Sequence, residues 1–271
     1  MQDFSVLMSV YAKDKTTWVA QALDSVLSNT AKPAEVVIVI DGPIPADLQA
    51  VLDEFSLKFK QIKLYPLEKN GGLGPALAYG LQQCSHELVA RMDADDNALP
   101  NRFEKQLAYF EKHPNTAILS GFIQEIDSKT LNPVAIRRVP LTNKEIRQYI
   151  KMRSPFNHMT VMFKKSAVLA AGNYTPFHLM EDYYLWARMA AKGYEMANLP
   201  DILLNARVDA AMYGRRGGLK YFKSNYAMSK KLRELGLISL PTHLFNTSVR
   251  FCVQVLMPNK MRSYFYKKVL R

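Results

Sequence analysis

Short apolar segments rich in β-branched residues alternate with longer amphipathic segments over about the first half of the chain. The short segments have the composition of buried strands and cover residues 5–11, 35–41, 62–67, 87–92 and 117–126. The longer segments have helical periodicity and cover residues 17–27, 46–58, 75–84 and 101–113. This alternation predicts βα units around a mostly parallel central sheet with helices on both faces.

The alternation loosens after residue 139. Helices are predicted at residues 143–151 and 165–171, and a third has Leu185, Trp186 and Met189 on one apolar face and is expected to stop at Gly193. From residue 218 onward a helical pattern mixes basic and aromatic side chains. We therefore predict an α/β/α sandwich at residues 1–210 and a C-terminal helical basic extension at residues 211–271.

The positive charge of the chain is concentrated in this extension. The formal net charge is +12. From Ala210 onward there are thirteen Lys and Arg and a single acid, Glu234, so the extension carries the whole excess and the residues before it are balanced. A localised positive segment indicates an anionic partner, and the candidates are nucleic acid, a phosphorylated ligand and an acidic membrane surface.

Apolar runs and cysteines limit the cellular compartment. Residues 36–40 form the longest obvious apolar run, far below the roughly 18 residues expected of a membrane span. The first residues include no basic leader or small-residue cleavage site, so we expect no secretion. Cys84 and Cys252 are far apart in the sequence, which favours reduced thiols in a cytosol over a disulfide framework.

Three carboxylates follow one of the predicted strands directly: Asp93, Asp95 and Asp96. Ligands of open parallel sheets bind beyond the carboxyl ends of the strands, and Asp41 ends another predicted strand, so Asp41 and Asp93 are expected to face one crevice. Carboxylate oxygens in this arrangement are suited to Mg²⁺ or Mn²⁺ with positions left for phosphate. The alternative is a solvated acidic loop without a metal.

Several motifs occur together in a fixed order: SVYAKD, ALDSVLSNT, EVVIVIDG, KNGGLGPALAYGL, RMDADDNALPNRFEKQ and LMEDYYLWARM. In order and approximate spacing this set resembles family 2 glycosyltransferases with the GT-A fold, over roughly residues 4–215. Within that family it is similar to bacterial transferases of the amylovoran type, which build O-antigen or exopolysaccharide. The resemblance implies a GT-A-like α/β/α sandwich.

For the nucleotide-sugar donor, the resemblance implies roles for residues at the strand ends. Asp41 matches the carboxylate that bonds the uracil ring of a UDP-sugar, and Ser9 and Tyr11 match residues that line the base. Asn70 lies in a loop that borders the nucleotide. Each also has a structural explanation, because Asp-Gly-Pro favours a turn and the Asn70 loop suits a plain strand-to-helix connection.

For the metal, the resemblance makes Asp95 the direct ligand and places Asp93 nearer the ribose, with Mn²⁺ or Mg²⁺ as the ion. Asp96 either substitutes for one of these two aspartates or holds the loop. Asp209 lies where many relatives have a histidine, so its role as a third ligand is in doubt. Arg215 and Arg216 form a basic loop that could hold the diphosphate, or else a solvated charged surface.

For the acceptor, the resemblance implies that Asp182, with Glu181 as the alternative, is the general base of an inverting transfer. A first helical turn also favours carboxylates through the helix dipole alone.

The expected reaction moves a hexose, from UDP-glucose or UDP-galactose, to a saccharide linked to a lipid diphosphate such as GlcNAc- or GalNAc-diphosphoundecaprenol. We expect a cytoplasmic protein, peripheral on the inner face of a bacterial plasma membrane, with no nucleic-acid partner. The extension could bind that membrane or pack on the core. Three alternatives are a sugar-phosphate nucleotidyltransferase, a basic nucleic-acid-binding protein and a non-catalytic protein that binds UDP-sugars.

Overall fold

The computed structural model describes residues 2–209, 217–258 and 261. Its strands are β1 (Phe4–Val10), β2 (Glu35–Ile40), β3 (Ile62–Pro66), β4 (Leu88–Asp93), β5 (Asn97–Ala98), β6 (Thr116–Asp127), β7 (Pro133–Arg137), β8 (Met162–Lys164) and β9 (Glu195–Val208). Its α-helices are α1 (Thr16–Leu27), α2 (Ala46–Lys58), α3 (Leu73–Gln83), α4 (Arg102–Lys112), α5 (Asn143–Tyr149), α6 (Lys165–Ala170), α7 (Glu181–Ala191), α9 (Gly218–Glu234) and α10 (Leu240–Phe251). A short 3₁₀ segment, η1 (His158–Thr160), and a π-helical segment, η2 (Cys252–Leu256), complete the described elements.

The strands form one sheet in the order β3-β2-β1-β4-β8-β6-β9-β5, with β7 paired to β6. Strands β3, β2, β1 and β4 run parallel, as the βα alternation predicts. Beyond β4 the sheet is mixed, because β8 is antiparallel to both β4 and β6, whereas β6 and β9 are parallel. The parallel part therefore brings the ends of β1, β2 and β4 to one edge of the sheet.

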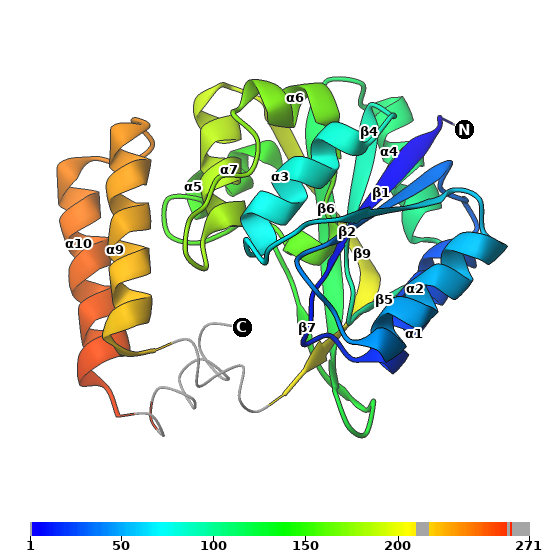
Figure 1. Ribbon diagram of the computed structural model, residues 1–271. Helices are drawn as coiled ribbons and strands as arrows, with labels where there is room; N and C mark the ends of the chain where they lie inside the picture. The colour runs from blue at the N-terminus through cyan, green and yellow to red at the C-terminus, as the bar shows by residue number, and fades with distance from the viewer. Residues whose placement is uncertain (1, 210–216, 259–260, 262–271) are drawn as a thin grey trace.

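Helices cover both faces of the sheet (Figure 1). Alternate residues of β1 separate the two cores, since Val6 and Met8 pack with α1, α2 and α4, whereas Leu7 packs with α3 and α7. The second core is built around the fully buried Trp186 of α7. Gly193 has a φ of 84° and closes α7, as predicted. The α/β/α sandwich is thus confirmed.

One buried carboxylate lies at the amino end of the parallel strands. Glu35 is 2% exposed and accepts hydrogen bonds from Ser5 Oγ at 2.8 Å, from the N–H and Oγ of Ser85 at 2.8 and 2.9 Å, and from Lys63 Nζ at 2.7 Å. Burial by itself would raise the pKa of Glu35, but these donors, Lys63 first, lower it to about 2. Glu35 therefore connects β1, β2, β3 and the segment that leads into β4.

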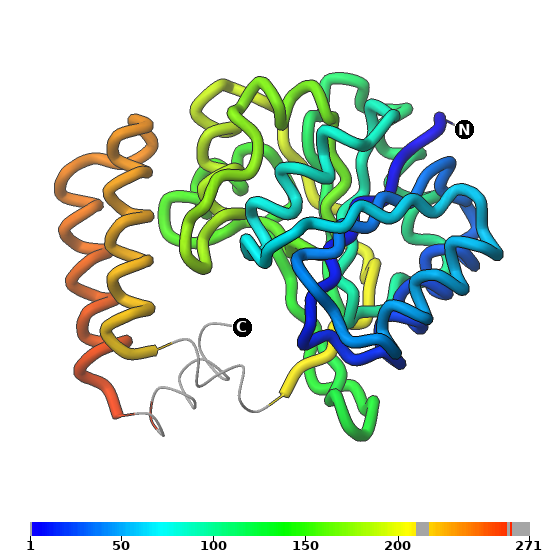
Figure 2. The backbone as a smooth tube through the Cα atoms, in the orientation of Figure 1, coloured from blue at the N-terminus to red at the C-terminus, as the bar shows by residue number. Residues whose placement is uncertain are grey.

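The helices α9 and α10 form an antiparallel hairpin beside α5 and α7 (Figure 2). Met228 and Leu232 of α9, with Ile238 of the connecting turn, belong to the same apolar core as Trp186. Asn246 of α10 donates from Nδ2 to the carbonyl of Lys151 at 2.9 Å. The described helices of the extension, α9 and α10, are therefore packed on the α/β body, whereas the domain boundary predicted near residue 210 stays a prediction.

Candidate active site

The acidic cluster lies in the turn between β4 and β5. Asp93 ends β4, and carboxylate oxygens of Asp93, Asp95 and Asp96 lie within 4.8 Å of one another. Asp93 and Asp95 are half-buried, and Asp96 is 3% exposed. Three oxygen ligands converging on one point suit a hard divalent cation, so the donor set fits Mg²⁺ or Mn²⁺. The turn does not behave as a solvated acidic loop, because its side chains are partly withdrawn from water.

The cluster carries more negative charge than its surroundings compensate. Burial, followed by the charge of Asp93, raises the pKa of Asp95 to about 6. Burial and the charges of Asp93 and Asp95 also raise the pKa of Asp96, although Asp96 Oδ1 accepts the N–H of Arg207 at 2.9 Å. Since a raised carboxyl pKa reports an environment unfavourable to the ionised form, a bound cation would relieve this strain.

Arg91 is the buried cation beneath this cluster, and sequence reasoning missed it. Its side chain is 1% exposed and forms an ion pair with Asp93, and its carbonyl accepts Arg102 Nη2 at 2.7 Å. Burial is the largest single influence and would lower the pKa of Arg91, but the charges of Asp93, Tyr174 and Asp96 and the hydrogen bond to Asp93 together outweigh burial and raise it. A basic residue inside the otherwise apolar stretch at residues 88–92 was the available signal, because arginine is rarely fully buried unless it is paired.

Asp41 fixes the loop that follows β3. Its Oδ1 accepts the N–H of Gly71 at 2.8 Å, its Oδ2 accepts the N–H of Gly72 at 3.0 Å, and its carbonyl accepts Asn70 Nδ2 at 3.0 Å. Gly42 allows this close approach, since its φ is +82° and a Cβ there would lie 2.5 Å from the Asn70 nitrogen. Asp41 thus has a structural role in holding the loop at residues 70–72, and its role toward a uracil ring stays a prediction.

The end of β1 lies between Asp41 and the acidic cluster. Val10 pairs with Ile40 and Ser9 pairs with Asp93 across the two parallel ladders, so the end of β1 is flanked by both carboxylate positions. Tyr11 follows β1 and is exposed. The structure therefore brings the predicted donor residues Ser9, Tyr11, Asp41 and Asn70 to one edge of the sheet, as the parallel topology requires.

Asp14 adds a further carboxylate beside this edge, and the sequence reading did not include it. It is half-buried and its Oδ2 accepts the N–H of Tyr11 at 2.9 Å. Burial raises the pKa of Asp14 to about 7 despite that donor, and the charges of Asp95 and Asp93 contribute to the rise. The spacing of Tyr11 and Asp14 in the sequence could have predicted the turn, because the hydrogen bond between them is local. It could not have predicted that Asp14 lies near Asp93 and Asp95, which are far away in the sequence.

Glu181 and Asp182 begin α7 on the other side of Arg91. The Cβ of Glu181 lies 3.4 Å from the position that a Cβ on Gly74 would take, so α7 begins against the start of α3. Burial raises the pKa of both carboxyl groups, and the charge of Arg91 acts in the opposite direction on each. One buried guanidinium is thus within electrostatic reach of the acidic cluster and of both candidate bases.

The remaining predicted residues lie near the end of β9. Asp209 follows β9 and is exposed, and its role as a metal ligand stays a prediction. Arg215 and Arg216 lie outside the described residues. Arg207 instead reaches the acidic turn in this structure, since it donates to the carbonyl of Asp95 and to Gln21, and its guanidinium lies 5.3 Å from the ring centre of Trp18.

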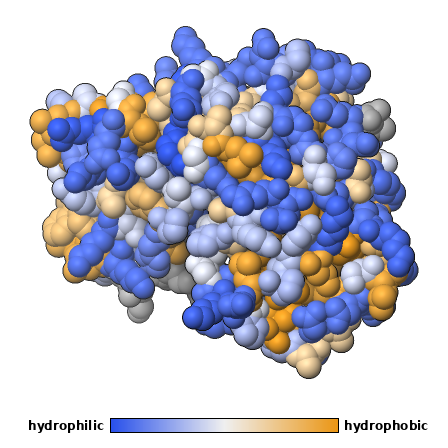
Figure 3. Space-filling model, turned by 45° about the horizontal axis from the view of Figure 1, so that its top comes forward, coloured by the Kyte–Doolittle hydropathy of each residue, from blue (hydrophilic) through white to orange (hydrophobic). Residues whose placement is uncertain are grey.

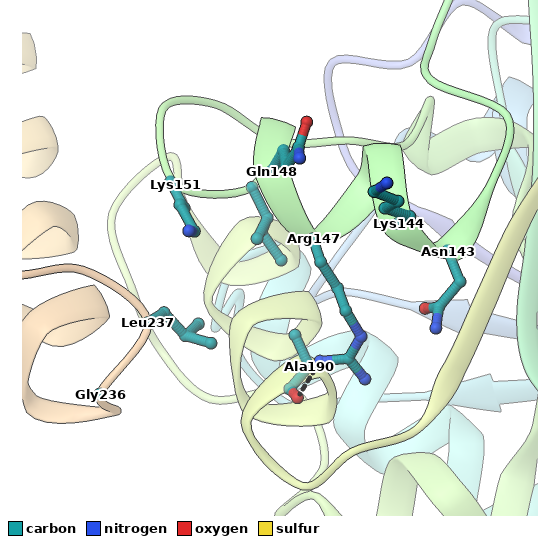
Figure 4. A pocket seen from close by; sticks show the side chains of 9 residues that line it. Asn143, Lys144, Arg147, Gln148, Lys151, Ala190, Gly236 and Leu237 are labelled. Atoms are coloured by element: carbon teal, nitrogen blue, oxygen red, sulfur yellow. Dashed lines mark hydrogen bonds between the residues drawn. The ribbon is translucent and has the colours of Figure 1, made fainter.

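A separate cleft of about 530 Å³ lies between α5, the end of α7 and the α9–α10 turn (Figure 4). Arg147 crosses it and donates to the carbonyls of Ala190 and Tyr194, both at 3.0 Å. Its lining includes Lys144, Lys151 and Leu237 but no predicted site residue. The cleft lies between the hairpin and the α/β body and is separate from the candidate active site.

Comparisons with known proteins agree with this architecture. The model of the family described as "Glycosyl transferase family 2" matches residues 5–169. The Erwinia amylovora protein named "Amylovoran biosynthesis glycosyltransferase AmsE" is 40% identical over 269 residues, which is 98% of each chain. The Escherichia coli protein named "UDP-Gal:alpha-D-GlcNAc-diphosphoundecaprenol beta-1,3-galactosyltransferase" is 39% identical over 268 residues, which is 99% of this chain and 96% of the relative.

Solved structures show the same fold at low sequence identity. Residues 1–349 of S. aureus TarS, in complex with UDP-GlcNAc, match with a TM-score of 0.69 at 16% identity, covering 98% of this chain and 79% of that one. The mannosyltransferase PcManGT from Pyrobaculum calidifontis, in complex with GDP-Man and Mn²⁺, matches with a TM-score of 0.62 at 14% identity, covering 99% and 86%. The predicted GT-A-like fold is confirmed. Since the family model matches more than half of the sequence and two relatives near 40% identity align over almost all of it, the chain belongs to glycosyltransferase family 2.

Proposed function

We propose that this glycosyltransferase moves a hexose from a UDP-sugar to a hydroxyl group of a saccharide carried on a lipid diphosphate, with inversion at the anomeric carbon. One observation carries the proposal: buried Arg91 lies within electrostatic reach of an acidic cluster suited to a cation and of two carboxylates suited to be a base. The donor and acceptor named for the Escherichia coli relative at 39% identity support the choice of substrates.

The donor side is the edge formed by β1, β2 and β4. Asp41 keeps the loop at residues 70–72 in place through two backbone N–H groups, and each of its oxygens retains acceptor capacity for a base N–H. Ser9 and Tyr11 would line the uracil, and the loop of Asn70 would border the nucleotide. The exposed ring of Tyr11 offers a stacking surface at this position.

Asp93 and Asp95 would hold a divalent ion, Mn²⁺ or Mg²⁺, with Asp96 as an additional oxygen donor. When bound, such an ion neutralises the negative charge that develops on the departing diphosphate. Asp209 is a further possible ligand in the proposal. The sequence places Arg215 and Arg216 nearby in the chain, and we propose that they steady the diphosphate.

The acceptor side begins at α7. As the acceptor oxygen forms its bond to the anomeric carbon, the bond from that carbon to the diphosphate oxygen breaks and its electron pair leaves with UDP. Asp182 accepts the acceptor proton, and Glu181 is the alternative. The raised pKa of each group makes it a stronger base than an ordinary surface carboxylate.

UDP release measures this reaction directly. UDP-glucose and UDP-galactose would each be offered with Mn²⁺ or Mg²⁺ and a GlcNAc- or GalNAc-diphospholipid acceptor. We expect acceptor-dependent UDP release, and we expect Asp182→Asn to reduce it by about 10³-fold or more, with Glu181→Gln as the matched control. The reverse ranking of the two variants would assign the base to Glu181. If neither UDP-glucose nor UDP-galactose yields acceptor-dependent UDP release, the proposed donor class is refuted.

The proposal also includes a cellular location, the inner face of the plasma membrane. A lipid-diphosphate acceptor used in O-antigen or exopolysaccharide biosynthesis would bring the enzyme to the inner face of the bacterial plasma membrane. Within the described residues, no helix is both long enough and apolar enough to span a bilayer. Any contact with the membrane by those helices would therefore be made from its surface.

A further inference from the structure

Helix α10 and the following segment η2 have reversed polarity. Their buried side chains are polar and include His243, Asn246 and Gln254. Their exposed side chains are large and apolar: Leu240, Leu244, Phe245, Val249, Phe251 and Leu256. A surface helix in water normally has the opposite arrangement, with its apolar stripe toward the core. We use the term outer face for these six apolar residues.

The buried polar contacts fix which side of α10 points outward. His243 Nδ1 lies 2.8 Å from Ser229 Oγ of α9, and Asn246 Nδ2 donates to the carbonyl of Lys151 at 2.9 Å. Arg250 donates to the carbonyl of Met152. Rotating α10 to hide its apolar side would leave these polar groups without their partners, which costs free energy for each buried group. The reversed polarity is therefore a property of the folded hairpin.

The outer face is uncharged, and cations flank it. The exposed residues of α10 between the apolar ones are Pro241 and Ser248, neither of which is charged. Lys220, Lys223 and Lys230 are exposed on the neighbouring helix α9. Figure 3 shows apolar side chains in orange beside hydrophilic ones in blue at the left edge, where the hairpin lies. An apolar strip next to a row of cations is the pattern of a helix that lies in a lipid interface.

We propose that the outer face docks on an anionic lipid surface, with its apolar side chains at the boundary of head groups and acyl chains and the lysines of α9 near lipid phosphates. Charge favours lipid over a second copy of this chain, because each copy brings thirteen cations and one acid from residue 210 onward, and two such segments repel each other. The docking does not depend on the proposed chemistry and would hold for any acceptor.

Co-sedimentation of the full chain with vesicles tests this docking. We expect binding to vesicles that contain phosphatidylglycerol and much weaker binding to vesicles of phosphatidylcholine alone. The double variant Leu244→Ser, Phe245→Ser should lower the partition constant by roughly tenfold or more, because these side chains are 56% and 61% exposed and supply the apolar contact. Leu57→Ser is the matched control, since Leu57 is 73% exposed on α2, and it should leave binding unchanged.

The cations are tested separately. Lys220→Ala and Lys223→Ala should each weaken binding to phosphatidylglycerol vesicles by about fivefold, and added salt should weaken it further. Wild-type-like binding by the Leu244→Ser, Phe245→Ser variant would overturn the proposal. So would a vesicle-free dimer, seen by sedimentation, that the same variant dissociates, since that result assigns the outer face to a second copy.

UDP release with a soluble acceptor analogue separates docking from catalysis. The Leu244→Ser, Phe245→Ser variant should keep wild-type turnover on that analogue and an unchanged thermal midpoint, because both side chains are exposed. Retained turnover with lost vesicle binding supports the docking surface. Retained vesicle binding in a protein that turns over no UDP-sugar would instead refute only the proposed chemistry.

Discussion

Carboxylates occupy both ends of the parallel strands, and their surroundings differ sharply. At the amino end, Glu35 meets Ser5, Ser85 and Lys63, and its pKa lies near 2. At the carboxyl end, Asp95 and Asp96 lie in a partly buried turn where burial and neighbouring charge raise their pKa values. The carboxylate at the amino end thus receives enough donors to stabilise its ionised form, whereas the surroundings of Asp95 and Asp96 at the carboxyl end disfavour the ionised form.

This difference separates a structural role from a functional one. A buried carboxylate whose ionised form already receives several hydrogen bonds stabilises the fold and gains little from binding a cation. A cluster whose negative charge is only partly compensated, here by Arg91 and Arg207, lowers stability unless a further cation binds, and functional sites are where proteins keep such arrangements. Substitutions at the two ends should therefore change different properties of the protein.

The largest effect is expected at the carboxyl end. Asp95→Asn removes a proposed metal ligand and should lower UDP release by about 10³-fold or more, while the metal-free protein stays as stable as wild type or becomes more stable. UDP release and thermal unfolding in chelator-treated buffer measure the two properties. Wild-type-like turnover would show that the cluster is not catalytic and would remove the basis of the comparison.

Arg91→Met should affect both properties. The substitution leaves half-buried Asp93 without its ion-pair partner, and breaking such a pair costs about 3 kcal/mol of unfolding free energy. It also removes the cation within reach of Glu181 and Asp182, so the pH profile of turnover should shift to higher pH. Denaturant titration and pH–rate profiles measure these changes, and Lys105→Met is a control for loss of a surface cation. A stable variant with an unchanged profile would contradict this role.

Glu35→Gln should reduce stability and leave chemistry intact. The amide cannot accept all of the donors that now meet the carboxylate, so we expect a loss of about 2 kcal/mol in the free energy of unfolding. Turnover per folded molecule should match wild type, because Glu35 is at the opposite end of the strands. A loss of turnover without a loss of stability would reverse the assignment of the two ends.

The smallest effect is a pH dependence of that difference. The folded-state pKa of Glu35, about 2, lies below its ordinary value of 4.5, so its contribution to stability is complete above about pH 4.5 and is lost as pH falls toward 2. The stability gap between wild type and Glu35→Gln should narrow over that range. Urea titrations at several pH values measure the gap, and a constant gap would show that Glu35 does not act through its ionised form.

Local sequence was sufficient for the parallel half of the fold. The helix α2 begins and ends at the predicted residues, and β1 to β4 agree to within a residue or two, because β-branched runs and helical periodicity are local signals. The pattern missed β7 and β9. In β9 the ladder to β6 shifts between Leu199 and Ile202, where Pro200 cannot donate a ladder hydrogen bond, and this interruption hid a 14-residue strand.

The candidate site likewise includes residues that local motifs predicted and residues that only the folded structure brings together. The ordered motifs identified the acidic cluster and the start of α7, and family membership favours a glycosyltransferase over the nucleotidyltransferase alternative. The position of Arg91 beneath both, and the contact of Arg207 with the acidic turn, depend on residues far apart in the chain. The reversed polarity of α10 could not be predicted from the sequence either. Its apolar residues are compatible with a buried stripe or an exposed one, and only the packing of the helix distinguishes the two.

The two-residue strand β5 has a consequence for ion choice. Asn97 and Ala98 pair with Asn205 and Leu204 of β9, so the acidic turn is clamped between that ladder and the end of β4. Widening the backbone of the turn would break this pairing, so the pairing opposes a rearrangement of the turn around a larger ion. We therefore expect ionic radius as well as charge to set the affinity of this turn for a divalent ion, with magnesium or manganese bound more tightly than the larger calcium.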